Sequence, residues 1–253
     1  ISDLICKGVQ PKFYFISGSG NKKTFSKINL NKISKSLKEE QKKYKIKLSG
    51  GDTTFSNKLS FTIISLGYSN KIIFRNNAKL NDDIYVTGNL GDSFLGLKIL
   101  QKKIKTKKKL ANFFVNKYYK PDIHLNLTKY LLNLANTSID ISDGLLNDLE
   151  KMLNKQNFSY HLNLNKIPIS KQLNEIIKIK NLKKNNLISN GDDYQVLFTA
   201  AAKKARIIEN ISKILGIKIS KIGKITSSKK RSVIIDEKGM QIVLKNKGYI
   251  HQF

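Results

Sequence analysis

The segment TSIDISDGLLNDLEKML, residues 137–153, changes within one turn from a strand pattern to a helix pattern. Its first residues are β-branched or alternate with polar ones, which is typical of a strand, and its leucine-rich end has helical spacing. In a strand, Asp140 and Ser142 would share one face, and Asp143 would stand at the turn into the helix. The segment therefore predicts a strand–turn–helix unit with carboxylates and a hydroxyl gathered at the turn.

Two interpretations of this turn stay open on the local sequence. Carboxylate and hydroxyl oxygens suit a Mg²⁺–nucleotide site, because Mg²⁺ prefers hard oxygen ligands and nucleotide phosphates. An Asx turn with an ordinary helix cap would explain Asp143 equally well.

A second strand–turn–helix unit precedes the first. Residues 83–87 are predicted as a strand, the turn Gly88-Asn89-Leu90-Gly91-Asp92-Ser93 follows, and a helix begins after it. This order resembles a phosphate-binding helix N-terminus, although neither a Walker motif nor a kinase glycine-rich loop is present. Asp92 could equally be a plain N-cap residue.

Two further acidic turns are predicted at the ends of apolar segments. The first is Gly50-Gly51-Asp52-Thr53-Thr54. Its two glycines would let the backbone approach a phosphate closely, and the alternative interpretation is a tight turn between a helix and a strand. Gly191-Asp192-Asp193-Tyr194-Gln195 precedes a strand, and its adjacent carboxylates need solvent, metal or hydrogen-bond donors. Arg75 is one of only three arginines in a lysine-rich chain, which suggests bidentate phosphate contact.

Helix and strand patterns alternate along the whole chain, so the predicted fold class is mixed α/β (α+β). Helices are predicted for residues 25–44, 124–135, 145–153 and 203–215. Strands are predicted for residues 59–68, 137–141, 195–200 and 218–225, with a hairpin over 233–244. A polar stretch at residues 76–83 marks the predicted boundary between domains 1–82 and 83–253.

The composition excludes several classes of protein. The chain has 253 residues with 40% apolar content, which is too much for a disordered polycation. Its one cysteine, Cys6, rules out a disulfide scaffold and a Cys-based zinc site, fits a reducing cytoplasm, and is expected to be a small core residue. The three histidines lack zinc-hydrolase spacing. No apolar run reaches the roughly 18 residues that a membrane-spanning helix needs.

The formal net charge of +29 first suggests nucleic acid. The lysines, however, are spread over every segment and accompany abundant Ile and Asn, as expected of a low-GC genome. We therefore expect no nucleic-acid partner, and a polybasic nucleic-acid binder with steeply salt-dependent binding is kept as an alternative.

Taken together, the motifs resemble the thiamine-monophosphate kinases, within the superfamily that includes aminoimidazole ribonucleotide synthetase. The resemblance spans nearly the whole chain. Each motif is short, but the number of motifs, their order and their spacing make the resemblance specific. The matching segments are Ser2-Asp3-Leu4 with Gly8 and Pro11, Gly50-Gly51-Asp52-Thr53-Thr54, Arg75 with Ala78-Lys79, Val86 to Ser93 with Gly96-Leu97, Asp140 to Leu145 with Asp148-Leu149, Gly191-Asp192-Asp193-Tyr194, and Gly248-Tyr249 with His251.

The resemblance implies ATP- and Mg²⁺-dependent phosphorylation of thiamine monophosphate to thiamine diphosphate, without a protein nucleophile. It also implies a two-domain fold like that of aminoimidazole ribonucleotide synthetase, in which the N-terminal sheet pairs across a homodimer. Carried over by position, the expected Mg²⁺ ligands are Asp3, Asp52, Asp140 and Asp143. The expected ATP contacts are Gly51, Asp52, Arg75 and Ser142, and the expected thiamine contacts are Gln195, Tyr249 and Phe253.

The sequence departs from the family pattern at identifiable places. An Asp-Asp metal motif and a substrate-contacting His of the family would lie upstream of Ile1, so we expect that a preceding segment is missing. Without it the Mg²⁺ cluster would be incomplete and activity in doubt. The family's Gly-Glu-Asp-Tyr-Glu reads Gly-Asp-Asp-Tyr-Gln here, so Gln195 lacks a charge. Another ATP-dependent member of the superfamily is the nearest alternative function.

Overall fold

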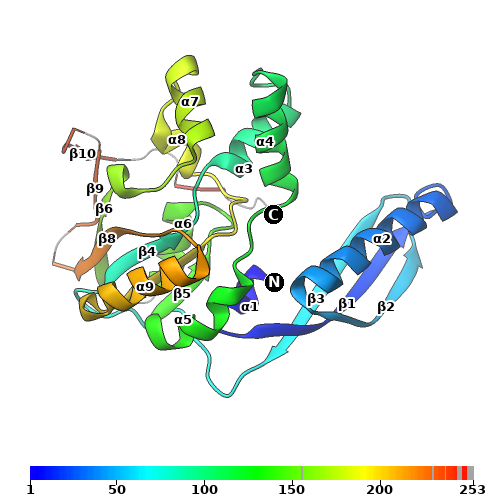
Figure 1. Cartoon of the computed structure of the whole chain (residues 1–253), viewed down its shortest axis with the longest axis horizontal. Helices are drawn as coiled ribbons and strands as arrows, with labels where there is room; N and C mark the ends of the chain where they lie inside the picture. Colours follow the sequence, from blue (N-terminus) through cyan, green and yellow to red (C-terminus); the bar gives the residue numbers. More distant parts are fainter. Residues whose placement is uncertain (155, 230, 237, 244–246, 250–253) are drawn as a thin grey trace.

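The protein contains two β-sheets, seen in a computed structural model that describes residues 1–154, 156–229, 231–236, 238–243 and 247–249 (Figure 1). The first sheet has three strands in the order β2-β1-β3, and the second has seven in the order β10-β9-β6-β8-β4-β7-β5. The first sheet comprises β1 (Gln10–Gly20), β2 (Lys47–Phe55) and β3 (Ser60–Tyr68). The second comprises β4 (Asp83–Thr87), β5 (Thr137–Asp140), β6 (Phe158–Asn163), β7 (Val196–Ala200), β8 (Ile219–Ser227), β9 (Val233–Ile235) and β10 (Gln241–Ile242).

Helices connect many of these strands. The α-helices are α1 (Ser2–Cys6), α2 (Lys27–Tyr44), α3 (Asp92–Leu100), α4 (Lys108–Tyr119), α5 (Thr128–Leu134), α6 (Leu145–Leu153), α7 (Lys171–Lys180), α8 (Lys184–Ile188) and α9 (Ala205–Leu215). Short 3-10 turns are η1 (Leu125–Leu127), η2 (Leu164–Lys166) and η3 (Ala202–Lys204). In the described part of the chain, no helix is both long enough and apolar enough to cross a membrane.

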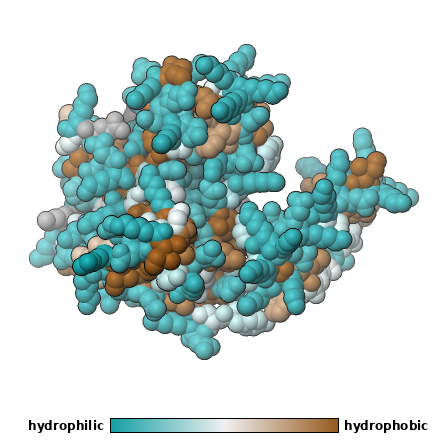
Figure 2. Space-filling view, in the orientation of Figure 1, coloured by the Kyte–Doolittle hydropathy of each residue, from teal (hydrophilic) through white to brown (hydrophobic). Residues whose placement is uncertain are grey.

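The first sheet is covered by α2 on one face. The Ser26 hydroxyl caps the start of this helix, and the left-handed residue Lys45 ends it. Tyr44 and Ile46 at that end are buried against Tyr14 of β1. Figure 2, drawn in the orientation of Figure 1, shows the α2 side of this unit to be mostly hydrophilic.

The opposite face of the first sheet is apolar. The register of β1 against β3 pairs Phe15 with Ile64 and Phe13 with Leu66, which places these side chains on the face away from Tyr14. Ile64 is 57% exposed and Tyr68, two residues beyond Leu66, is 74% exposed. Among the described helices, α2 lies over this sheet, and it covers only the other face (Figure 1).

The second sheet is buried between helices on its two faces. Along β4, Ile84 and Val86 enter one cluster together with leucines of α6, and Tyr85 enters another. The second cluster joins α1, α5 and α9 to the other face of the sheet. Cys6 of α1 is 1% exposed in this cluster, so its predicted place in the core is confirmed.

The predicted fold class is confirmed, because helices and strands alternate around both sheets. Helices α2, α6 and α9, strands β3, β4, β5 and β7, and the β9–β10 hairpin lie where the sequence predicts them. Strands β1 and β6 and helices α4 and α7 were not predicted.

Candidate active site

The carboxylate of Asp140 lies at the end of β5, beside helix α1. The Ser2 hydroxyl donates a 2.7 Å hydrogen bond to Asp140 Oδ2. Burial raises the pKa of the Asp140 carboxyl, the nearby Asp3 carboxylate raises it further, and the bond from Ser2 opposes both effects. The structure therefore brings together Asp3 and Asp140, two of the four predicted metal ligands, from distant parts of the sequence.

Asp143 stands in the turn between β5 and α6. The backbone N–H groups of Asp143 and Gly144 donate hydrogen bonds to Asp148 Oδ2 at 2.9 and 3.0 Å. Because Asp148 belongs to the first turn of α6, these bonds hold the β5–α6 connection against the start of the helix. The Asp143 carboxylate contacts the Lys151 ammonium, whose Nζ also lies 3.6 Å from Asp148 Oδ1. Sequence reasoning missed Lys151, although its position one helical turn beyond Asp148 places it on the same helix face.

The loop of residues 190–194 is fastened to this turn. The N–H of Asp192 donates to the Ser142 carbonyl at 2.9 Å, and the N–H of Tyr194 donates to the Ile141 carbonyl at 2.8 Å. Asp192 and Tyr194 both have left-handed backbones, with φ of 67° and 51°. A side chain at Gly191 would place its Cβ 1.8 Å from the Ser142 carbonyl oxygen, so only glycine permits this close approach.

A pocket of about 430 Å³ opens where the two segments meet. Aromatic and apolar side chains form part of its wall, and the carboxylates of Asp143 and Asp192 with other polar residues form the rest. Its lining residues are Phe94, Leu97, Ser142, Asp143, Asn190, Gly191, Asp192, Tyr194 and Tyr249. Burial, followed by the nearby Asp143 carboxylate, raises the pKa of Asp192, so the site disfavours the charged form of Asp192.

Tyr249 is placed in this pocket by backbone bonds, as its N–H donates to the Asp143 carbonyl at 2.7 Å. The predicted thiamine contact Phe253, and His251 of the family motif, lie outside the described residues. Gln195, the remaining predicted contact, is 3% exposed and bonds to other protein groups below the pocket.

The helix N-terminus of α3 does not present the free anion site that its sequence resembles. The buried carboxylate of Asp193 accepts a 2.8 Å hydrogen bond from the Gly91 N–H at this terminus. Asp92, the first helical residue, is itself buried and accepts a 2.7 Å bond from the Ser170 hydroxyl. The positive end of the helix therefore holds a carboxylate of the protein's own loop, which anchors residues 190–194.

The Gly50–Thr54 motif lies within strand β2 rather than in a turn. A Cβ on Gly51 would lie 1.8 Å from the Ile16 carbonyl oxygen of β1, so the glycine is needed for strand pairing. Asp52 Oδ1 accepts a 2.7 Å hydrogen bond from the Thr53 N–H. This residue lies in an open pocket of about 480 Å³, which is lined by Ile16, Leu48, Gly50, Gly51, Asp52 and Thr53.

Arg75 is exposed on the connection between β3 and β4, and its charge lowers the pKa of Lys7 at the end of α1, after the larger effect of burial. It therefore lies on the side of the molecule that carries Asp3 and Asp140.

The predicted metal ligands are only partly gathered. Asp3 and Asp140 are neighbours, Asp143 contacts Lys151, and Asp52 belongs to the other sheet. Within the described residues, no group of three or more His, Cys, Asp or Glu side chains is arranged to hold a metal ion. The donor chemistry suits Mg²⁺, whereas one chain as described does not assemble a complete cage.

Comparisons with known proteins agree with the motifs. Residues 80–236 match the family model "AIR synthase related protein, C-terminal domain". The chain is 37% identical to the thiamine-monophosphate kinase of Buchnera aphidicola subsp. Schizaphis graminum, covering 99% of this chain and 77% of that protein. It is 30% identical to the Escherichia coli enzyme of the same name, with the same coverage of both chains.

Solved structures match over most of the chain as well. A structure described as AaThiL complexed with AMPPCP and TMP superposes with a TM-score of 0.84 at 22% identity, covering 99% of this chain and 77% of that one. Thiamine-monophosphate kinase from Stenotrophomonas maltophilia superposes with a TM-score of 0.83 at 26% identity, covering 93% of this chain and 75% of that one.

Proposed function

The chain belongs to the thiamine-monophosphate kinase family, and we propose that it transfers the γ-phosphoryl group of ATP to thiamine monophosphate, giving thiamine diphosphate and ADP. The observation that carries this proposal is the 37% identity to a kinase of this name over 99% of the chain. The geometry supports it, because a pocket with aromatic walls adjoins the turn that follows Asp140.

The residues present suit this chemistry. A phosphate oxygen of the acceptor is already ionised, so no strong protein base is needed to activate it. The barrier lies in bringing polyanions together and neutralising the charge that develops on the transferred group. Accordingly, we assign no catalytic nucleophile, and we propose that the site acts by holding both substrates in line.

Asp3 and Asp140 are the pair that we propose for Mg²⁺, together with phosphate oxygens of ATP. Their donors are oxygens only, as Mg²⁺ prefers, and burial together with the Asp3 carboxylate raises the pKa of Asp140. A bound Mg²⁺ supplies charge neutralisation for the phosphates. Asp52 and Asp143 remain predicted ligands. Among the described residues, they do not form one metal-binding group with Asp3 and Asp140.

We propose that ATP approaches from the first sheet and the thiamine group from the pocket. Gly51 and Asp52 line an open pocket on β2, Ser142 lines the pocket of the second sheet, and Arg75 is exposed on the connection between the two sheets; these four are the ATP contacts that we propose. Tyr249 is the aromatic side chain that we propose to contact thiamine, because it is 60% exposed and lines the pocket.

We further propose that the protein is a homodimer in the cytoplasm. The apolar face of the first sheet, formed by Phe13, Phe15, Ile64, Leu66 and Tyr68, is the surface expected to pair with a second copy. ATP as co-substrate and the free thiol of Cys6 are consistent with a reducing, ATP-rich compartment.

The test is a coupled assay of ADP release from ATP and Mg²⁺ in the presence of thiamine monophosphate. We expect ADP release that depends on thiamine monophosphate and does not occur with thiamine itself, which lacks the acceptor phosphate. ADP release with an aminoimidazole ribonucleotide precursor and not with thiamine monophosphate would instead favour another activity of the superfamily.

A further inference from the structure

The segment of residues 120–125, which connects α4 to η1, bridges the two halves of the molecule. We call it the interdomain strap. Ile123 and Leu125 of the strap pack against Tyr14 and Tyr44 of the first sheet and α2. The same two side chains also pack against the cluster that includes Phe198 of β7. The strap therefore contacts both units with adjacent apolar residues.

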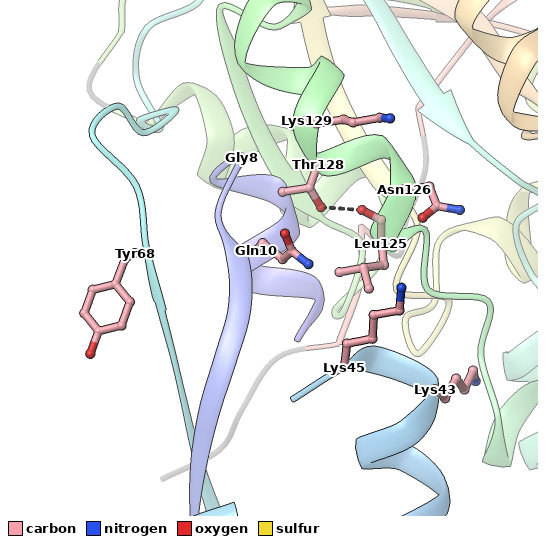
Figure 3. Close-up of a pocket in the computed structure, with 9 residues that line it drawn as sticks. All are labelled: Gly8, Gln10, Lys43, Lys45, Tyr68, Leu125, Asn126, Thr128 and Lys129. Carbon is pink, nitrogen blue, oxygen red and sulfur yellow. Dashed lines mark hydrogen bonds between the residues drawn. The ribbon is translucent and has the colours of Figure 1, made fainter. Parts of the chain in front are cut away.

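A groove of about 430 Å³ runs alongside the strap. Figure 3 shows Leu125 in this groove, with Gln10 of β1 beside it and Lys45, from the end of α2, facing it. Ile1, which precedes α1, packs against the same two clusters, so the strap and the start of the described chain both join the two units through apolar contacts. A shift of the strap would change how the first sheet sits against the second.

Gln195 forms a hydrogen bond with His124 in the strap. His124 Nε2 lies 2.8 Å from Gln195 Oε1, and the Thr87 hydroxyl donates to the same oxygen at 2.8 Å. The amide nitrogen of Gln195 faces the backbone carbonyls of Asp122 and Asp193 at 3.4 Å.

The surrounding groups fix the direction of these bonds. Because both carbonyls can only accept, the amide nitrogen must point toward them, and the amide oxygen must point toward His124. Burial lowers the pKa of His124, so the ring is neutral and donates from Nε2. Gln195 is 3% exposed, which leaves its amide committed to the strap rather than open to a ligand.

Gln195 also lies between the pocket loop and β7, which begins at the next residue. Its carbonyl accepts a 2.9 Å bond from the Ile141 N–H, next to Asp140. The backbone of Gln195 therefore bonds to the segment that carries Asp140 in the second sheet, and its side chain bonds to the strap, which contacts the first sheet.

We propose that Gln195 is a positioning residue, which through its hydrogen bond to His124 fixes the strap and so aligns the ATP side of the site with the carboxylate side. The inference rests on the proposed function. It gives the Gln195 side chain a positioning role in place of the direct thiamine contact that the resemblance implies. It predicts that loss of the bond slows phosphoryl transfer without weakening the binding of either substrate.

The experiment compares Gln195→Met, which keeps the length of the side chain without its amide, with His124→Ala and the double variant. The matched controls are Gln172→Met on α7 and His161→Ala on β6, which lie away from the strap. We expect kcat to fall about 10- to 100-fold in both single variants, with KM for ATP and thiamine monophosphate unchanged within about twofold. The double variant should fall no further than the singles, and His124→Gln, which keeps a donor, should recover activity.

A second readout does not depend on activity. Hydrogen exchange at the amides of Leu125 and Leu127, which bond to the Ile123 and His124 carbonyls, should be faster in Gln195→Met and His124→Ala than in the controls. If the wild-type protein forms no thiamine diphosphate but exchange changes as expected, the proposed function fails and the fastening role stands.

Other outcomes overturn the inference. A raised KM for thiamine monophosphate with unchanged kcat in Gln195→Met would mean direct substrate contact. Additive losses in the double variant, or unchanged exchange and kcat in both single variants, would mean that the pair does not act as a unit. Should Gln195→Met fail to fold, His124→Ala, at a half-buried position, gives the same test.

Discussion

The two sheets differ in how completely they bury their own side chains. Every residue of β4 and β7 in the second sheet is buried, whereas every residue of β2 in the first sheet is exposed. Helices cover both faces of the second sheet, and α2 covers one face of the first. The second sheet thus completes its own core and carries the Asp140 carboxylate, while the first leaves an apolar face exposed, which we propose pairs with a second copy.

The largest effect is expected at the carboxylates of the second sheet. Asp140→Asn should reduce kcat/KM for phosphoryl transfer about 100- to 1,000-fold, because the variant loses charge stabilisation of the phosphate–metal complex. The midpoint of urea unfolding should not fall, since the substitution removes a buried carboxyl whose pKa is raised.

Glu39→Gln, at an exposed position of α2, serves as the control and should keep wild-type activity. Activity of Asp140→Asn within about twofold of the wild type would contradict the assignment of the site to this sheet.

A substitution on the first sheet should disturb assembly instead. Ile64→Lys places a charge in the apolar face, so the dissociation constant of the dimer should rise at least about 100-fold. Light scattering over a concentration series would measure it, with Ile28→Lys, an exposed apolar residue of α2, as the matched control. A wild-type protein that stays monomeric at all concentrations would refute the pairing of this face.

The buried start of α3 should make the second sheet's domain sensitive to pH. Burial raises the pKa of Asp92 from 3.8 to about 6, so the folded state holds this proton more tightly than the unfolded state. The stabilisation is present at low pH and is lost as the pH rises from about 4 to about 6, with a drop of about 2 kcal/mol in the free energy of unfolding.

Asp92→Asn retains an acceptor for the Ser170 hydroxyl but cannot titrate. Urea unfolding at several pH values should therefore show a smaller decline in this variant than in the wild type. Identical pH dependence of the two proteins would show that Asp92 is not titrating in this range.

The smallest effect is expected at the mouth of the pocket. Tyr249→Leu should raise KM for thiamine monophosphate about fivefold, since stacking of an aromatic ring contributes about 1 kcal/mol, and it should leave KM for ATP unchanged. Tyr249→Phe keeps the ring and serves as the control. Equal increases for the two substitutions would instead implicate the phenol hydroxyl.

Much of the second sheet could be predicted from the sequence because its elements are locally encoded. The strand–turn–helix of residues 137–153 is found as predicted, with Asp140 closing β5 and Leu145 opening α6. The Gly50–Thr54 motif was harder, because its glycines are required by the neighbouring strand β1, which is distant in sequence and was not predicted.

Contacts between distant segments were beyond local patterns. The bond from the Gly91 N–H to Asp193 joins two loops that are far apart in the sequence, so it could not be foreseen. Lys151, by contrast, lies close to Asp143 in the sequence and was signalled by its place one helical turn beyond Asp148. The burial of Gln195 depends on its contacts with Thr87 and His124, which lie far from it in the sequence, whereas its neighbours Gly-Asp-Asp-Tyr indicated only a turn.

The most direct test of the central claim is ³¹P NMR of the protein with ATP, Mg²⁺ and thiamine monophosphate. The account predicts that the thiamine monophosphate resonance is replaced by the paired resonances of thiamine diphosphate, with one ADP formed for each, and that Asp140→Asn abolishes most of this conversion. Loss of ATP γ-phosphate to inorganic phosphate alone, with thiamine monophosphate unchanged, would contradict it.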